Sequence, residues 1–528
     1  MGSVDSGNRR SLAIRGALFL LALALPARLA WQGRDVPFLG HFHDDGLYWV
    51  SAKSLAEGAG YRIASLPGEP HQTKYPPLYP ALLAVIWKIQ PGFPGNVTPA
   101  LVVSWLALPA YLLLTSALLT AMGVGRTRAW VICLILAAHP RVGFLGANLM
   151  ADLLFCALIS AALWMAHRGE KPGVAGLLAG AAFLAKVAAL PLLVTAPLCY
   201  LLRKRHRHAA LFAAGMLPAV LGWTLWTMRR APASTDPALL YYTNYLGYYR
   251  ATVSWSDLPL VLAKNAAGLL ANICDLVLPA SSAILPTAVV WLLALAFIGA
   301  AIRWARRAHA LQYLLFAAGY AGLFLFWNFP PNERFLLPLY PLLLAALVEA
   351  WVEVSDWSRG GHWSPSAIRR AAVVLAPLPL AGLPGLAIGG ICLGHAQLPG
   401  LYEARRQVLA DHRKAYEWIR RNTPASANFI AFEDPNLYAY TGRRARRQPA
   451  SAMTFYRLTD RQSILEPLAA LPDAAAGRYR YLLVSPTDYP DELLESERVW
   501  LRQRMEERFG SRAVFRSGEV RVYELGAK

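Results

Sequence analysis

Residues 98–122 read TPALVVSWLALPAYLLLTSALLTAM, an apolar stretch without a single charged side chain. The hydrocarbon core of a bilayer, ~30 Å thick, is crossed by an α-helix of roughly 20 apolar residues, so this stretch predicts a membrane span. Runs of similar character recur between residues 11 and 393. With 56% hydrophobic and only 16% charged residues over 528 positions, the chain is too apolar for an ordinary soluble enzyme of that size.

Basic residues at the ends of these runs orient the predicted helices. Cytoplasmic loops carry an excess of Lys and Arg, so Arg9 and Arg10 place the N-terminus inside, and RKRHRH at 203–208 marks a later inner loop. The basic clusters together fit about eleven spans, at residues 11–31, 98–122, 129–146, 151–167, 172–185, 187–202, 209–228, 284–302, 311–327, 334–352 and 371–393. The short apolar stretch 76–89 is predicted to be a half-helix at the outer interface. Because the N-terminus is inside and the number of spans is odd, the C-terminal segment is predicted to lie on the extracytoplasmic side of the cell (inner or plasma) membrane.

Beyond residue 401 the sequence is rich in Arg, Glu and Asp and contains no further run long enough to span. Its apolar patterning predicts helices at 405–421, 455–470 and 491–508 and strands at 428–432, 479–484 and 519–523. The expected fold is therefore mainly α: a polytopic α-helical membrane domain over residues 1–395, in which 32–97 form a first outer loop with interfacial helices. A small extracytoplasmic α/β domain follows at 400–528.

The net charge of +20 does not indicate a nucleic-acid partner. Many of the basic residues sit at the ends of apolar runs and are not interleaved with aromatic residues along one stripe. This placement is typical of anchoring to membrane lipids.

The loop after the first predicted helix contains HFHDDGLYW at residues 41–49, with His41, His43, Asp44 and Asp45 among its polar groups. Ionisable side chains beside lipid are costly unless they bind a partner. Adjacent carboxylates can accept protons, so the motif predicts a catalytic site. The structural alternative is a solvated loop in which an Asp caps a helix.

Further along this loop, Lys74 and Tyr75 precede the pair Pro76-Pro77. The prolines set the start of a helix, which leaves Lys74 near a helix N-terminus where an anion is favoured. A phosphate could bind there. A proline-rich turn whose Lys extends to the interface explains the segment equally simply.

Three later positions carry ionisable groups at predicted outer helix ends. Asp152 opens one helix, Lys186 lies between two Ala-rich helices, and Arg334 follows Glu333 at the start of another. An unpaired cation at such depth calls for an anionic partner, and an Arg fork suits phosphate. Helix capping by Asp152, pairing of Arg334 with Glu333 and interface anchoring are the alternatives.

All these groups map to one face of the membrane. Acids that accept protons and cations that hold phosphate together indicate a transferase whose leaving group is a lipid-linked phosphate. A membrane transporter or lipid-linked-sugar flippase is the alternative function, although such proteins usually have two related halves with polar groups near the midplane. A sensor with a ligand-binding tail is a third option.

The order of these motifs resembles the GT-C superfamily of membrane glycosyltransferases. The branch with protein O-mannosyltransferases and lipid A aminoarabinose transferases is the more similar one. The matching motifs are Asp44-Asp45, Lys74 with Pro76-Pro77-Leu78, Met150-Ala-Asp152, GAAFLAK at 180–186 and RFLLP at 334–338, with WIRRNTP at 418–424 and YTGR at 440–443 in the tail. The resemblance implies an inverting glycosyltransferase that moves a hexose or pentose from a polyprenyl-phosphate donor to an extracytoplasmic lipid, glycan or protein.

The resemblance also implies roles for the acidic residues. Asp44 would be the catalytic base that deprotonates the acceptor as it attacks the anomeric carbon. Asp45, the second member of the catalytic pair, and Asp152 would position the acceptor, the sugar or an ion. Tyr75 and Glu333 would be further substrate-positioning residues.

Lys74, Lys186 and Arg334 would hold the donor phosphate as it departs. The family often has an acid directly before its Lys-Pro-Pro, whereas here Thr73 precedes Lys74 and Tyr75 intervenes. This departure predicts a different local geometry.

A divalent metal ion is an open possibility as a cofactor. His41 and His43 share one face if their segment is extended, and with Asp44 or Asp45 they could ligate such an ion. The sequence contains no second ligand cluster at metal-binding spacing.

Overall fold

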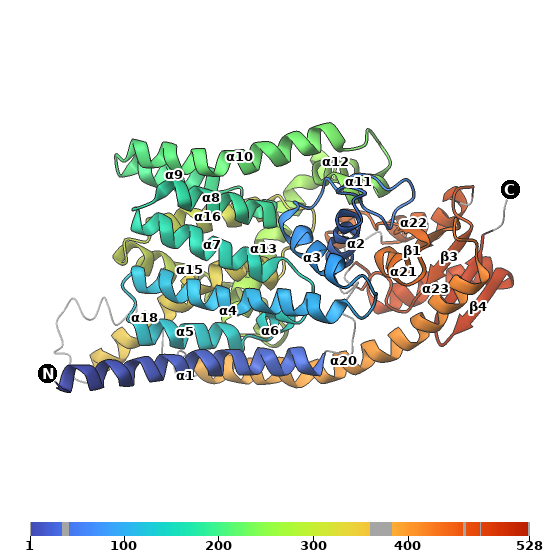
Figure 1. Ribbon diagram of the computed structural model, residues 1–528. Coiled ribbons are helices and arrows are strands. Elements are labelled where there is room, and N and C mark those ends of the chain that lie inside the picture. Colours follow the sequence, from blue (N-terminus) through green and yellow to red (C-terminus); the bar gives the residue numbers. More distant parts are fainter. Residues whose placement is uncertain are drawn as a thin grey trace.

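The computed structural model describes residues 2–33, 42–358, 383–457, 461–475, 477–490 and 492–525. Long helices lie side by side in a bundle, and a small sheet domain lies at one end of it (Figure 1). The helices along the bundle are α1 (Gly2–Gln32), α4 (Val97–Ala121), α5 (Arg126–Ala138), α7 (Asp152–Arg168), α8 (Pro172–Ala185), α9 (Leu192–Leu202), α10 (His206–Arg230), α15 (Thr287–Arg307), α16 (Leu311–Leu325), α18 (Tyr340–Ser358) and α20 (Leu383–Asn422).

Within the described ranges, six helical segments are long and apolar enough to cross a membrane. A seventh results if α5 and α6 (Pro140–Gly146), which are bent by 74°, form one broken span. The chain is therefore a multi-pass membrane protein. Because α8, α9 and α16 are shorter than a full span, the number eleven stays a prediction, as does the direction of the chain across the membrane. Residues 371–382 of the last predicted span lie outside the described residues.

The two ends of the bundle differ in their polar contacts. At one end, Arg128 of α5 pairs with Glu349 of α18 at 2.7 Å, and Arg307 of α15 pairs with Glu353. This basic end gathers loops that the sequence assigned to the inner side. The opposite end, here called the site end, holds α2 (Asp44–Ala56), α3 (Leu78–Ile89) and the sheet domain (Figure 1). The predicted half-helix at 76–89 corresponds to α3.

Small residues set the spacing of α8 and α10. A Cβ atom on Gly176 would lie 2.1 Å from the carbonyl oxygen of Phe212 in α10, so only glycine permits this approach. Close packing at small residues is how helices associate in membranes. It fixes α8, whose C-terminal end carries Lys186 to the site end.

The segment between α10 and α15 was left without a helix by the sequence analysis, and this was wrong. It forms α11 (Pro237–Thr243), α12 (Tyr245–Thr252), α13 (Leu258–Val277) and α14 (Ser281–Ile284). In α13, Asn265 donates to the carbonyl of Trp327 at 2.9 Å and Asn272 to that of Pro331 at 2.6 Å. Both contacts go to the loop after α16. Polar residues interrupt the apolar run of α13, which hid it from a search for spans.

The sheet domain has five strands in the order β2-β1-β3-β5-β4. The strands are β1 (Asn428–Ala431), β2 (Arg444–Arg446), β3 (Tyr481–Val484), β4 (Ala513–Ser517) and β5 (Val520–Glu524). β1 pairs in parallel with β2 and β3, and β5 runs antiparallel to β3 and β4. The helices α21 (Asp434–Thr441), α22 (Gln462–Ala475) and α23 (Glu495–Phe509) complete the domain. Three strands and two of these helices were predicted, whereas β2, β4 and α21 were not.

A single helix joins the bundle to the sheet domain. The sequence predicted a span ending at residue 393 and a separate helix at 405–421, but α20 runs without a break from Leu383 to Asn422 (Figure 1). Pro399 lies inside it. The predicted domain boundary at 395–400 therefore falls within a continuous helix.

Candidate active site

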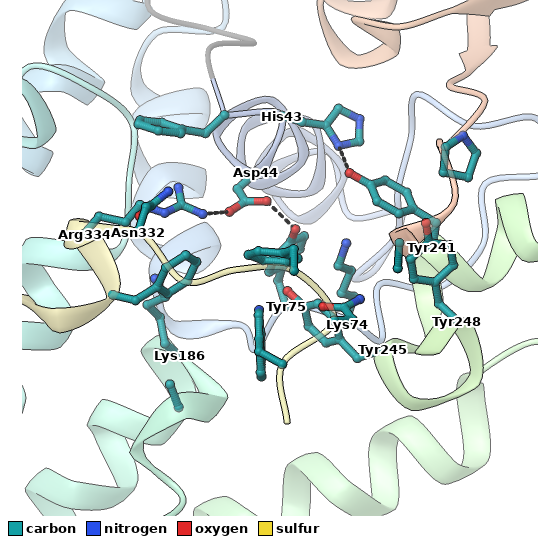
Figure 2. A pocket seen from close by; sticks show the side chains of 18 of the residues that line it. His43, Asp44, Lys74, Tyr75, Lys186, Tyr241, Tyr245, Tyr248, Asn332 and Arg334 are labelled. Atoms are coloured by element: carbon teal, nitrogen blue, oxygen red, sulfur yellow. Dashed lines mark hydrogen bonds and ion pairs between the residues drawn. The ribbon is translucent and has the colours of Figure 1, made fainter. Parts of the chain in front are cut away.

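A cavity of about 280 Å³ lies between the site end of the bundle and the sheet domain. Three parts of the chain form its wall: the first loop with α2, the ends of the later bundle helices, and loops of the sheet domain. Its ionisable lining residues include His43, Asp44, Lys74, Lys186, Arg334, Arg447 and Glu492. Figure 2 shows Asp44 in the middle, with Arg334 and Lys186 on one side and Lys74 among tyrosines on the other.

Asp44 is held by two hydrogen bonds. Its Oδ1 accepts from the hydroxyl of Tyr75 at 2.5 Å, and its Oδ2 accepts from Nη2 of Arg334 at 2.9 Å. Burial alone would raise the pKa of Asp44, but Arg334, Lys74 and the Tyr75 hydrogen bond outweigh it and hold the pKa below its ordinary value. Asp44 is therefore a carboxylate at neutral pH, able to accept a proton once a partner moves away.

Two N–H groups of Arg334 have no hydrogen-bond partner among the described residues. Its side chain is buried between the rings of Phe42 and Phe335, and only Nη2 is bonded to Asp44. Among the described residues, its Nε and Nη1 have no hydrogen-bond partner. Buried N–H groups without a partner are rare because they are costly. An anionic ligand with several oxygens would satisfy them.

Lys74 is a buried ammonium surrounded by aromatic rings. Its Nζ lies 4.1 Å from the ring centre of Tyr241 and 4.8 Å from that of Tyr245. The ion pairs found in the described part of the chain do not include Lys74. Burial lowers its pKa to about 8, against the opposing effect of Asp44. The side chain is thus positively charged at neutral pH.

Lys186, which lines the cavity, forms an ion pair with Asp152, which is not among the described lining residues. Nζ of Lys186, just beyond the end of α8, lies 2.8 Å from Oδ1 of Asp152 in the first turn of α7. The other oxygen of Asp152, Oδ2, is buried without a partner among the described residues. The pair brings together two residues that the sequence placed at the same membrane face.

Asp45 lies elsewhere. It is fully buried and is not among the described residues that line the cavity, and its Oδ1 accepts from the backbone N–H of Gly46 at 2.7 Å. Asp44 and Asp45 open α2, and neighbouring residues of a helix point in directions about 100° apart. In this arrangement Asp44 lines the cavity, and Asp45 is packed inside the protein.

Glu333 points away from Arg334. Its Oε2 accepts from Nη2 of Arg141 at 3.1 Å, so it stabilises the turn before α18. The neighbouring Asn332 lines the cavity in its place. Tyr75, which was also expected to position substrate, lies directly on Asp44.

The proposed metal ligands are not arranged as expected. His41 lies outside the described residues, and His43 has φ 60° and ψ −38°, so the extended backbone assumed for this segment is interrupted there. The Nε2 atom of His43 is bonded to Asp434 at 2.9 Å. The described residues contain no group of three or more His, Cys, Asp or Glu side chains that could hold a metal ion. The divalent ion therefore stays an open possibility from the sequence, and the described residues do not assemble a site for it.

The sequence analysis missed the aromatic and sheet-domain wall of the cavity. Nη2 of Arg447 forms an ion pair with Glu492, and its Nη1 donates to the hydroxyl of Tyr241 at 3.1 Å. The segment YYTNYLGYY at 241–249 supplies Tyr241, Tyr245 and Tyr248 to the lining. This density of tyrosine in a polar loop was a usable signal. Arg447 and Glu492 gave none, because nothing local marks them.

The chain was compared with protein families, curated proteins and solved structures. No protein-family model and no curated protein matches the sequence. Among solved structures, the chain is similar to ArnT from Cupriavidus metallidurans bound to undecaprenyl phosphate, with a TM-score of 0.50 and 15% identity over 98% of this chain and 97% of that one.

The chain is also similar to the archaeal oligosaccharyltransferase AglB from Archaeoglobus fulgidus in complex with an inhibitory peptide and a dolichol-phosphate. The TM-score is 0.52 at 13% identity, over 89% of this chain and 69% of that one. Another AglB structure, in complex with Zn and sulfate, matches with a TM-score of 0.52 at 12% identity, over 89% of this chain and 67% of that one. Both neighbours are GT-C membrane glycosyltransferases, so this chain has the GT-C fold, as the sequence resemblance predicted.

Proposed function

We propose that the chain is an inverting glycosyltransferase that moves a sugar from a polyprenyl phosphate to an acceptor at the extracytoplasmic face of the membrane. The observation that carries this proposal is the cavity in which Asp44 lies between Arg334, two of whose N–H groups have no partner among the described residues, and the buried ammonium of Lys74. The solved structures with this fold that contain undecaprenyl phosphate and dolichol-phosphate support a lipid phosphate as the ligand of these cations.

In the proposed reaction, Asp44 takes the proton of an acceptor hydroxyl or amine. The acceptor atom then bonds to the anomeric carbon as the bond from that carbon to the phosphate oxygen breaks, and the electron pair stays on the phosphate. Lys74, Lys186 and Arg334 stabilise the charge that develops there, and fixed groups of this kind lower the energy of the transition state. A single displacement inverts the anomeric centre.

The hydrogen bonds of Asp44 suggest how binding of the donor could free the carboxylate to act as a base. Both carboxylate oxygens are bonded, to Tyr75 and to Arg334. A phosphate bound by Arg334 would compete with Asp44 for the guanidinium and leave Oδ2 free to take the acceptor proton. In this proposal the base becomes available only when the donor is in place, which would limit wasteful hydrolysis.

The acceptor would enter from the sheet-domain side. The lining residues there include Phe432, Phe455, Arg447, Glu492 and Tyr248. Aromatic faces with a few charged groups bind sugars and other polar organic molecules. The proposal leaves lipid, glycan and protein acceptors as alternatives.

The test is release of undecaprenyl phosphate from a panel of undecaprenyl-phosphate-linked sugars, measured by mass spectrometry on the full chain in proteoliposomes with a cell-envelope lipid and glycan extract as acceptor. Asp44→Asn keeps the size of the side chain but removes the base, so transfer should fall by about 10²–10⁴. Glu349→Gln, the same chemical change at the basic end, should leave it intact. Full activity of Asp44→Asn would exclude Asp44 as base, and donor transport without release would favour the transporter.

A further inference from the structure

A carboxylate of the sheet domain is bonded to the residue that directly precedes the proposed base. Asp434 is fully buried in the first turn of α21 and accepts three hydrogen bonds, all from the membrane domain. The donors are Nε2 of His43 at 2.9 Å, the hydroxyl of Tyr242 at 2.6 Å and the hydroxyl of Ser65 at 3.1 Å. A buried carboxylate is costly unless its oxygens are bonded in this way. Asp434 therefore ties three segments of the membrane domain to one point.

The hydrogen bonds of His43 have a defined direction. A carboxylate accepts hydrogen bonds, so the proton of the neutral imidazole lies on Nε2, which faces Asp434. Nδ1 must then accept, and the hydroxyl of Tyr241 donates to it at 3.3 Å. Nη1 of Arg447 donates in turn to the oxygen of Tyr241. The hydrogen bonds thus run in one direction, from Arg447 through Tyr241 and His43 to Asp434.

The backbone of His43 needs such support. Its φ of 60° with ψ of −38° is sparsely populated by residues other than glycine, and this residue directly precedes Asp44. Strained conformations persist where the surroundings fix them, and they gather at functional sites. The side chain of His43 is held at both ring nitrogens, which keeps the turn at the start of α2 in place.

We propose that Asp434 is a positioning residue for the reaction at Asp44, acting from the sheet domain through His43. It orients the imidazole, the imidazole fixes the strained turn, and the turn aims Asp44 into the cavity. This inference rests on the proposed function for its catalytic consequence. Its structural core, the hold of Asp434 on the start of α2, is independent of any substrate.

Asparagine and alanine at this position separate hydrogen bonding from charge. In Asp434→Asn the amide oxygen can accept from His43 and Tyr242 while the amide N–H₂ donates to Ser65, so the turn is kept. In Asp434→Ala the imidazole loses its acceptor. Ser65→Ala is the matched control, because it removes a hydrogen bond to the same carboxylate without touching His43.

The activity arm compares these variants in the transfer assay. A misplaced catalytic group costs about a hundredfold in rate, so kcat of Asp434→Ala should fall by about that factor. The donor KM should stay within about twofold of wild type, because none of the three cations proposed to hold the donor phosphate is among the hydrogen-bond partners of Asp434 described above. Asp434→Asn and Ser65→Ala should keep most of the activity. Wild-type kcat in Asp434→Ala, or a loss confined to KM, would overturn the inference.

The structural arm is hydrogen exchange on the full chain in detergent, which needs no substrate. In Asp434→Ala the amides of residues 43–47 should exchange faster, while β3 and β5 stay protected. Unchanged protection at 43–47, or faster exchange throughout the sheet, would show that Asp434 does not hold this turn specifically. If the wild-type chain transfers no sugar, the proposed function fails, and the exchange comparison still decides whether Asp434 positions Asp44.

Discussion

Oδ2 of Asp44 and Nη2 of Arg334 lie 2.9 Å apart in a buried ion pair, although 290 positions separate them in the sequence. The pair joins the start of the first loop to the entry of α18. It favours the ionised form of the carboxylate and holds one of its oxygens. The effect of this ion pair on the ionisation of Asp44 can be measured in the pH dependence of sugar transfer.

Removal of Arg334 should shift the acidic limb of activity. Arg334 favours the ionised form of Asp44 and lowers its pKa, so Arg334→Gln should raise that pKa. Since the base must be ionised to act, kcat/KM should decline at a higher pH than in wild type. Arg141→Gln, which frees Glu333 instead, is the control. Coincident acidic limbs would contradict the role assigned to the pair.

Lys74 should govern the alkaline limb. Burial lowers its pKa to about 8, so the free enzyme loses this charge as the pH rises through that value. If Lys74 binds the donor phosphate, kcat/KM for the donor should fall above about pH 8, because this ratio reports the ionisation of the free enzyme. Lys74→Arg stays charged and should abolish that decline, even if its lower activity reflects the changed shape. A limb that persists in the Arg variant would have another origin.

The Lys186–Asp152 pair allows stability and catalysis to be separated. Loss of one partner of a buried pair costs about 3–5 kcal/mol, and since Lys186 is 15% exposed we expect about 3 kcal/mol for Asp152→Asn. The double variant Asp152→Asn/Lys186→Met should recover most of this in thermal unfolding, because an apolar side chain replaces the unpaired charge. It should not recover transfer. Full recovery of both would show that the pair is only structural.

Gly46 tests the contact between the membrane domain and the sheet domain. A Cβ atom on Gly46 would lie 2.7 Å from Cβ of Pro435, the residue after Asp434. Gly46→Ala should therefore push α21 away from α2 at a cost of about 1–3 kcal/mol and lower kcat. Gly222→Ala in α10, where no atom lies within 4 Å, should change stability by less than about 1 kcal/mol. Equal behaviour of the two variants would contradict close docking at Gly46.

Much of the site followed from the sequence because the membrane restricts where charge can lie. Asp44, Lys74, Lys186 and Arg334 were all assigned to one face from the positions of basic loops, and the structure brings these four to one cavity. Helix ends at the same membrane face lie in one thin layer, which restricts how far apart their side chains can be. Proximity within that layer was therefore predictable without any knowledge of helix packing.

The failures arose where one turn or one distant contact decides the outcome. Asp45 was paired with Asp44 as if both lay in a loop, but a helix begins at Asp44 and turns the second acid inward. His43 was treated as extended, and its partner Asp434 is 391 positions away. No local pattern in a single sequence marks such a contact. The many tyrosines at 241–249 could be seen in the sequence, but no helix or strand was predicted there, so their position relative to the site could not be inferred.

The continuous helix α20 has a mechanical consequence. Its 40 residues correspond to a rod about 60 Å long, with one end in the bundle and the other under the sheet. A tilt of about 5° at the membrane end would carry the far end roughly 5 Å, given the rise of a rigid helix. Movement at the membrane end of α20 is therefore carried along the helix to the sheet domain, whose residues Phe432, Arg447 and Glu492 form part of the cavity wall.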